Sequence, residues 1–167
     1  MIHFLLILLA FLLTLGISWW SLAYFSSRKW EGSIQFTLEA SPTEVYALLT
    51  DLNRLPERRK EVEKIEILQP TAQGQLHWRE IARVGAYAEF ELIRYVKDAY
   101  WEIRMLRSSF GLKGTWIFQL EQKERNTLLT ITETSQADHF WIRGLMQLAG
   151  RNATLKQEKK MLQKAFG

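Results

Sequence analysis

The chain has 167 residues, of which 47% are hydrophobic and 13% aromatic, which is enough for one domain with a substantial core plus an additional segment. The absence of Cys excludes disulfides and cysteine-ligated metal sites, while 7 Trp indicate a large packed core or a pocket for apolar ligands. The formal net charge of +4 is modest and would suit an anionic membrane surface as well as nucleic acid.

The chain begins with a long uncharged apolar segment. No Asp, Glu, Lys or Arg precedes Arg28, and a bilayer core needs about 20 apolar helical residues, so this segment is long enough to span a membrane. Its far end carries the aromatic residues expected at a membrane–water interface, namely Trp19, Trp20 and Tyr24. We therefore predict a transmembrane anchor over residues 1–27, followed by a short linker over residues 28–32.

A cleaved signal peptide is the alternative for this segment, because Ser21-Leu22-Ala23 resembles a small-x-small cleavage site. No Lys or Arg precedes the apolar run, and the run is long for a signal sequence, so the anchor is favoured. Arg28 and Lys29 follow the anchor, and the positive-inside rule then places the domain in the cytoplasm. The prediction is a single-pass protein of the bacterial inner membrane with its domain on the cytoplasmic side.

The soluble part, residues 33–167, opens with an alternating strand over residues 33–40. Ser41-Pro42-Thr43-Glu44 then has the pattern of a capping box with Pro at the first helical position, which predicts a helix start. A second short helix is expected over residues 51–62, broken by Pro56. Its charged run, residues 57–60, is expected to face solvent, or alternatively to contact a membrane surface.

Six further alternating segments follow, separated by turns rich in Gly, Pro, Asp or Asn. They cover residues 64–68, 76–84, 86–97, 100–107, 113–121 and 127–136. Because the connections between them are short, the pattern predicts one antiparallel sheet.

The last stretch, residues 140–166, carries an apolar stripe at helical spacing, formed by Trp141, Leu145, Leu148, Leu155, Leu162 and Phe166. We expect one long helix that presses this stripe against the sheet and leaves an apolar pocket between them. The stripe also fits a heptad repeat, but Asn152 and Lys159 would occupy the seam of such a coiled coil.

Three segments resemble the START-related SRPBCC superfamily, in particular its polyketide cyclase/dehydrase-like bacterial members. They are LEASPTEVYALLTDLNRLPE, GTWIFQLEQKERNTLLTITE and AGRNATLKQEKKMLQKAF, and the resemblance extends over residues 33–166. It implies an α+β helix-grip fold, in which a curved antiparallel sheet wraps around a long C-terminal helix and encloses a deep cavity. Members of this superfamily bind lipids, sterols, quinones or polyketides, and some act as cyclases. Where the family often has Trp after its Pro-Glu pair, this chain has Arg58.

Alternation along each predicted strand selects the face that turns towards the helix. The resulting candidate ligand-binding residues are Trp78, Glu80, Phe90, Leu92, Arg94, Trp101, Ile103, Met105, Trp116, Phe118, Ile131, Glu133, Trp141 and Leu145. The aromatic members could equally be plain core, but the three Trp residues of the strands offer the large flat surfaces that suit an apolar ligand.

Three members of this inward set are charged: Glu80, Arg94 and Glu133. A buried carboxylate is costly unless it is paired, so a structural ion pair of Arg94 with one of the two Glu residues is one interpretation. The other is a site for the polar head of a ligand, or a general acid, with Glu133 and Glu80 as the catalytic candidates.

Three functions are consistent with the predicted anchor, fold and cavity. The first is membrane-tethered binding, or transfer, of a lipid, isoprenoid or other hydrophobic small molecule. The second is an enzyme of the cyclase or hydratase kind that uses a cavity carboxylate, and the third is a partner-binding module whose cavity its own side chains fill. The sequence has neither a metal-spaced His cluster nor a phosphate-binding Gly-rich loop, so no metal and no cofactor are expected. Nucleic acid is not expected as a partner, because the basic residues are scattered.

Overall fold

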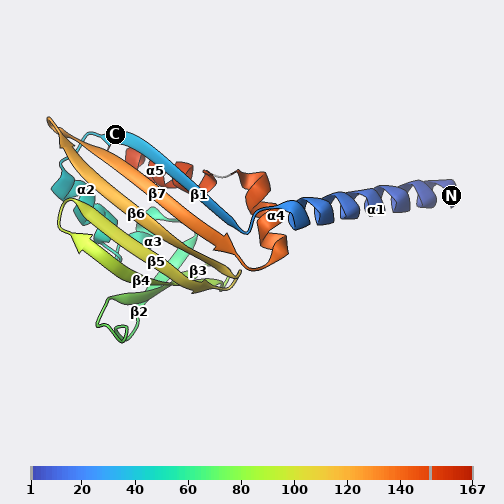
Figure 1. Ribbon diagram of the computed structural model, residues 1–167, viewed down its shortest axis with the longest axis horizontal. Coiled ribbons are helices and arrows are strands. Elements are labelled where there is room, and N and C mark those ends of the chain that lie inside the picture. The colour runs from blue at the N-terminus through green and yellow to red at the C-terminus, as the bar shows by residue number, and fades with distance from the viewer. Residues whose placement is uncertain (1, 151, 167) are drawn as a thin grey trace.

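A seven-stranded antiparallel sheet, in the order β1-β7-β6-β5-β4-β3-β2, forms the body of the protein (Figure 1). The computed structural model describes residues 2–150 and 152–166. The strands are β1 Lys29–Leu38, β2 Val62–Ile67, β3 His77–Ala82, β4 Tyr87–Val96, β5 Tyr100–Ser108, β6 Leu112–Lys123 and β7 Asn126–Ala137. The helices are α1 Ile2–Phe25, α2 Pro42–Thr50, α3 Leu55–Arg58, α4 Phe140–Ala149 and α5 Ala153–Phe166.

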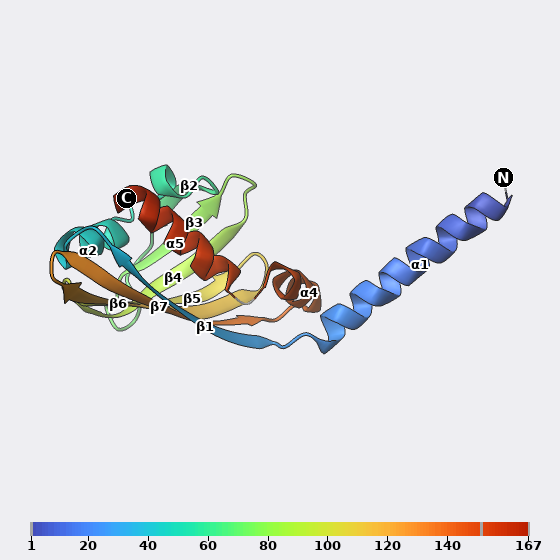
Figure 2. The ribbon, with the colours of Figure 1, turned by 90° about the horizontal axis from the view of Figure 1, so that it is seen from above.

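Helices α2 and α5 lie over one face of the curved sheet, and α5 crosses that face (Figure 2). The core between them is built from the inward positions of the strands together with α2 and α5, where Leu155 and Leu162 are completely buried. The α+β helix-grip fold expected from the sequence is therefore present. The buried apolar residues of β1 and of β3 to β7 meet on one face of the sheet, as strand alternation predicts.

The start of α2 forms as the sequence predicts. The Ser41 backbone N–H donates to Glu44 Oε2 at 2.9 Å, and the Glu44 N–H donates to Ser41 Oγ at 3.4 Å. Pro42 occupies the first turn, where its missing N–H costs nothing. This cap fixes the point at which the chain leaves β1 and turns over the sheet.

The single long C-terminal helix predicted from the apolar stripe is wrong, because the chain breaks into α4 and α5. Gly150 has a φ of 90°, which ends α4, and its N–H donates to Met146 O at 3.1 Å. Glycine adopts positive φ at little cost, so this residue ends a helix that the hydrophobic spacing alone would continue.

Two other boundaries also differ from the prediction. Strand β1 begins at Lys29, so most of the predicted linker, residues 28–32, pairs with β7, starting with Lys29 opposite Gln136. The predicted helix over residues 51–62 is reduced to the four residues of α3, and Arg59 is already extended. Leu55 is the only fully buried residue of α3, and a segment with so little apolar surface is not held as a longer helix.

Helix α1 projects from the end of the sheet at which β1 begins (Figure 1). Residues His3–Phe25 have a mean hydropathy of 2.2 and are long and apolar enough to cross a membrane, as no other described helix is. A signal sequence would meet the same criteria. The large apolar side chains of α1 stay exposed along most of its length, and Ala23 near its end is fully buried.

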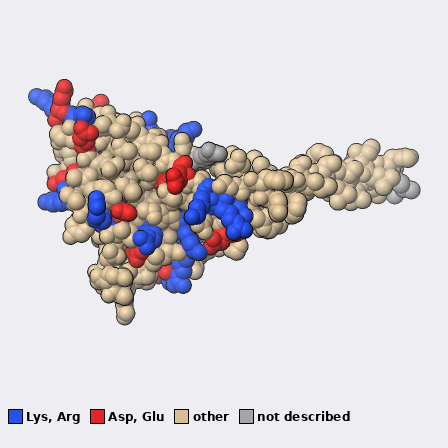
Figure 3. Space-filling model, in the orientation of Figure 1, with Lys and Arg blue, Asp and Glu red and all other residues tan. Residues whose placement is uncertain are grey.

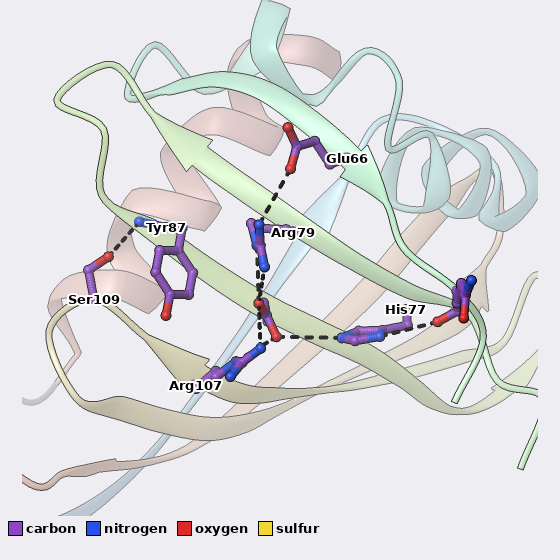
Figure 4. A network of polar contacts seen from close by, with 8 residues as sticks. Glu66, His77, Arg79, Tyr87, Arg107 and Ser109 are labelled. Atoms are coloured by element: carbon purple, nitrogen blue, oxygen red, sulfur yellow. Dashed lines mark hydrogen bonds and ion pairs between the residues drawn. The ribbon is translucent and has the colours of Figure 1, made fainter. Parts of the chain in front are cut away.

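On the outer face of the sheet, the buried carboxylate of Glu89 links three strands. Arg79 donates to it at 2.6 Å from β3, and Arg107 donates to it at 2.7 Å from β5. Figure 4 shows the guanidinium groups of Arg79 and Arg107 and the ring of His77 placed around this carboxylate. Hydrogen bonds from Arg107 hold the pKa of Glu89 below its ordinary value, and those from Arg79 reinforce this effect. The network therefore stabilises the ionised carboxylate and fixes the register of β3, β4 and β5.

Replacing Glu89 by Gln should destabilise the domain by about 1 to 2 kcal/mol at neutral pH, because two charge-assisted contacts are lost while the arginines can still be hydrated. The folded-state pKa of Glu89 lies below its ordinary value of 4.5, so the ion pairs contribute fully above that pH. Their contribution disappears as the pH falls through the lowered pKa. Urea unfolding of both proteins between pH 7 and acid should show their difference shrinking. Glu39→Gln, at an exposed position, is the control; a constant difference would contradict the assignment.

Candidate functional site

A cavity of about 240 Å³ lies between the inner face of the sheet and the helices that cover it. Strands β3 to β6 supply Trp78, Glu80, Ala88, Phe90, Trp101, Ile103, Met105, Trp116 and Phe118. The opposite wall comes from α2, α3, α5 and the segments that flank α3, with Leu49, Leu52, Leu55, Arg58, Arg59, Glu61, Thr154, Gln157, Glu158 and Met161. The cavity is therefore enclosed by strands β3 to β6 on one side and by α2, α3 and α5 on the other.

Aromatic rings cover the sheet side of this cavity. Trp78 stacks on Phe90 at a centroid distance of 5.5 Å, and Phe90 lies 6.1 Å from Trp116. Trp78 and Phe90 meet because β3 and β4 are neighbours and the two residues are directly opposite. Trp116 of β6 reaches Phe90 across β5, which lies between their strands. Flat, rigid walls of this kind contact an apolar ring or chain over a large area at little entropic cost.

The polar end of the cavity is formed by Glu80, Arg59 and Glu158. Arg59 Nη1 lies 3.6 Å from Glu80 Oε2, and the same guanidinium pairs with Glu158 of α5. The Trp78 indole N–H also donates to Glu80 at 3.4 Å. Burial raises the pKa of Glu80, whose side chain is 13% exposed; Arg59 and the indole oppose this effect, and Glu61 adds to it. A carboxyl held in this way can donate or accept a hydrogen bond.

The cavity opens between α3 and α5. A surface hollow of about 540 Å³ shares six residues with it, namely Arg58, Arg59, Glu61, Gln157, Glu158 and Met161. Two contacts cross this opening, the Arg59–Glu158 ion pair and the hydrogen bond from Gln157 Nε2 to Glu61 Oε1 at 2.8 Å. The outer rim carries Lys60, Lys160 and Lys164 together with Glu57. We refer to this region as the mouth.

Most of the strand residues predicted to face the helix do line the cavity: Trp78, Glu80, Phe90, Trp101, Ile103, Met105, Trp116 and Phe118. Leu92 and Ile131 belong to the core packed beside it but do not line it. The alternation rule therefore selected the correct face for these strands, and the cavity occupies part of that face.

Arg94 does not face the cavity, contrary to the prediction. The register shifts between Leu92 and Arg94, so that Leu92 opposes Ile103 while Arg94 opposes Glu102. A β-bulge of this kind inserts one residue and reverses the facing of those that follow. Arg94 is exposed on the outer face, with its guanidinium 4.4 Å from the centroid of the Tyr100 ring. The ion pair of Arg94 with Glu80 or Glu133 is therefore absent.

Glu133 faces inwards and is 2% exposed, but it does not line the cavity. Its two carboxylate oxygens accept hydrogen bonds from the Ser135 and Thr154 hydroxyls. Thr154 is in the first turn of α5, so Glu133 ties that helix to β7. Of the two catalytic candidates, only Glu80 lies in the cavity wall.

Trp141 and Leu145 were predicted to close the cavity and do not. Each is 52% exposed, because the break at Gly150 directs α4 away from the sheet and onto α1. Cavity residues that the prediction missed include Glu158 and Arg59, the latter part of the charged run expected to face solvent. Their pairing across the mouth depends on the end of α3 and on the direction of α5, and spacing in the sequence carries no signal for either.

The family model for polyketide cyclase / dehydrase and lipid transport matches residues 38–161. The chain belongs to this family. Comparison with curated proteins gave no match. Within the family, binding of hydrophobic molecules is the function that the name suggests, and the cavity lies inside the matched segment.

Solved structures with the same fold cover most of this chain. A START superfamily protein from Mycobacterium smegmatis is 14% identical, with a TM-score of 0.65, over 81% of this chain and 96% of that one. Ara h 8.0201 is 15% identical, with a TM-score of 0.64, over 83% and 95%. A truncated norcoclaurine synthase from Thalictrum flavum is 11% identical, with a TM-score of 0.62, over 84% and 94%. At these identities the likeness shows the START-like fold, and the chemistry must come from the residues of this chain.

Replacing Arg59 by Gln should raise the pKa of Glu80 further, because Arg59 is the largest influence that favours its ionised form. A carbon-13 NMR titration of the Glu80 carboxyl in both proteins measures this directly. Lys60→Gln, on the outer rim, is the matched control and should leave the titration unchanged. An ordinary Glu80 titration in the unaltered protein, or no response to the loss of Arg59, would contradict the description of this site.

Proposed function

We propose that the protein is a membrane-tethered binding domain for a small hydrophobic molecule with a polar end. The observation that carries this proposal is the aromatic cavity that ends at Glu80 and Arg59, in a chain of a family named for polyketide cyclases and lipid transport. In this proposal residues 1–27 are the anchor, residues 33–167 are the binding domain, and that domain lies on the cytoplasmic side of a bacterial inner membrane.

The size of the cavity limits the ligand. About 240 Å³ lies below the range of about 300 to 1,000 Å³ that is usual for drug-sized ligands. A single flat ring system or a short isoprenoid segment fits, and a longer chain would extend through the mouth. The aromatic wall would contact the apolar body of the ligand, which could be a lipid or an isoprenoid.

The polar end limits the chemistry of the head group. Burial favours the protonated form of Glu80, which then offers an O–H donor, and Arg59 offers N–H donors beside it. A ligand carbonyl, hydroxyl or carboxylate would satisfy these donors. We therefore propose Glu80 and Arg59 as the head-group site and Trp78, Phe90, Trp101 and Trp116 as the walls.

An enzyme of the cyclase or hydratase kind is the second candidate, and the raised pKa of Glu80 favours it. Glu80 would then act as the proton donor or acceptor at the end of the aromatic cavity. The two candidates differ in what Glu80→Gln does: an enzyme loses turnover and keeps binding, whereas a binding protein shows no turnover to lose.

Ala88→Phe should fill the cavity and abolish binding. Ala88 lines the cavity and is partly buried, so a ring at this position occupies ligand space at a stability cost of about 1 to 3 kcal/mol. Native mass spectrometry of the detergent-purified full chain, followed by organic extraction, should show a bound molecule in the unaltered protein and none in the variant. Ala47→Phe, at an exposed position of α2, is the control. Equal occupancy in both variants would argue against this cavity as the site.

Leu13→Arg tests the anchor. An Arg at the centre of a spanning helix costs about 2.5 to 3.5 kcal/mol of insertion free energy, so the variant should lose membrane association in part or whole. The unaltered chain should stay in the membrane fraction after alkaline carbonate extraction and should have its full-length mass. A chain whose signal peptide had been cleaved would have a lower mass. Ser27→Arg, beyond the end of α1, is the control. Release of the unaltered chain into the soluble fraction would remove the tether from the proposal.

A further inference from the structure

Helix α4 exposes an apolar stripe that the cavity does not use. Trp141 and Leu145 are each 52% exposed, and Leu148 is 65% exposed. The three residues follow one another at spacings of four and three, so they share one face of the helix. Phe110, 50% exposed, is next to this end of the domain, because the Asp138 N–H donates to Gly111 O at 3.0 Å. Soluble domains rarely leave such large apolar side chains together in water.

The same helix packs directly on the end of α1. A Cβ at Gly144 would lie 3.3 Å from Ala23 Cβ and 3.3 Å from Trp19 Cζ2, so the two helices are in close contact there. Gly144 borders the exposed stripe, since it precedes Leu145 and lies three residues after Trp141. The stripe is therefore a lateral extension of the apolar surface of α1.

This contact sets the depth of α4 relative to a bilayer. The 24 residues of α1 make a helix about 36 Å long, slightly longer than a hydrocarbon core of about 30 Å. Trp19 and Ala23 are in its last two turns, among the aromatic residues expected at the interface. With α1 spanning the bilayer, α4 lies at the level where hydrocarbon gives way to head groups.

Basic side chains gather on the domain near the C-terminal end of α1, as Figure 3 shows. A hollow of about 270 Å³ on the sheet is lined by Lys29, Arg104 and Lys113, and among the described residues no acidic side chain lines it. All three are exposed, although Lys113 also pairs with Asp138 at 2.8 Å and Arg104 with Glu91 at 3.3 Å. Lys29 is four residues beyond the end of α1, and both Lys29 and Lys113 oppose Gln136. With α1 spanning the bilayer, this cationic surface would be near the head groups at that end of the anchor.

We propose that α4 is an interfacial helix that docks the domain on an anionic lipid bilayer. In this arrangement Trp141, Leu145 and Leu148 lie among the upper acyl chains, and Lys29, Arg104 and Lys113 contact anionic head groups. The proposal rests on the membrane tether proposed above and adds a second attachment, which fixes the orientation of the domain. A flexible tether alone would leave the stripe in water.

The test uses single introduced cysteines, because the full chain has 0 Cys of its own. Leu145→Cys reports on α4, and Leu9→Cys reports on the apolar part of the anchor. Ile67→Cys, exposed on β2 at the far edge of the sheet, is the aqueous control. Each variant of the full chain is spin-labelled and reconstituted in vesicles of phosphatidylethanolamine and phosphatidylglycerol. Collision rates with oxygen, which partitions into lipid, and with a water-soluble nickel chelate are then measured.

The Leu145 label should collide severalfold more often with oxygen than with the nickel chelate, as the Leu9 label does, while the Ile67 label shows the opposite. A lipid-like Leu9 label together with a water-exposed Leu145 label would overturn the docking and leave the tether intact. A water-exposed Leu9 label would overturn both. Dipolar broadening at Leu145 would show that a second copy covers the stripe, which also overturns the proposal.

Leu145→Glu with Leu148→Glu provides an independent measurement. Both side chains are more than half exposed, so the double variant should keep the unfolding temperature of the unaltered domain. With Thr134→Cys as the labelled site, an exposed and uncharged position in the same hollow, the double variant should show severalfold higher access to the nickel chelate on vesicles that contain phosphatidylglycerol. Unchanged access would show that α4 does not hold the domain on the bilayer.

Discussion

The positive φ of Gly150 divides the C-terminal segment into α4 and α5, and the different surfaces on which these two helices pack depend on that division. After the break, α5 crosses the concave face of the sheet and buries Leu155 and Leu162. Before it, α4 leaves the sheet and packs on α1 through Gly144. A continuous helix could not satisfy both contacts, because its single apolar stripe would have to face the sheet throughout. Gly150 therefore separates a helix that closes the cavity from one that joins the domain to α1, and Gly144 allows the close contact between α4 and α1.

Large aromatic rings line the sheet side of the cavity, and space remains between them and the helices on the other side. Stacking of Trp78 on Phe90 holds these rings against the sheet, and α5 approaches from the other side with the smaller Thr154 and Met161. The space between them ends at a carboxyl that is buried beside one arginine. Burying a charge is costly, so Glu80 is the place in this wall where a ligand's hydrogen bond has the greatest effect. Its pairing through Arg59 with Glu158 links that end of the cavity to the closing helix.

Much of this arrangement was predictable from the sequence, and the failures have physical causes. Alternation identified the strands and the inward rings, since one face of each strand meets the core. It failed at Arg94, because a bulge adds one residue without leaving a mark in the spacing. Helical spacing failed at Trp141 and Leu145 for a similar reason. The spacing identifies an apolar helix face, but it does not identify the surface on which that face packs. Arg59 was missed because its partner, Glu158, is distant in the chain.

The position of the mouth bears on how a ligand would be exchanged. The mouth lies beside α3 and the later turns of α5, whereas α4 and α1 are at the opposite end of the domain (Figures 1 and 2). A domain docked through α4 would thus present its opening, with its basic rim, to the aqueous side. Direct entry from the adjacent leaflet would require the opening at the other end. The arrangement instead favours exchange with a molecule that arrives through water or on a carrier. Such exchange requires both contacts across the mouth to separate, the Arg59–Glu158 ion pair and the Gln157–Glu61 hydrogen bond.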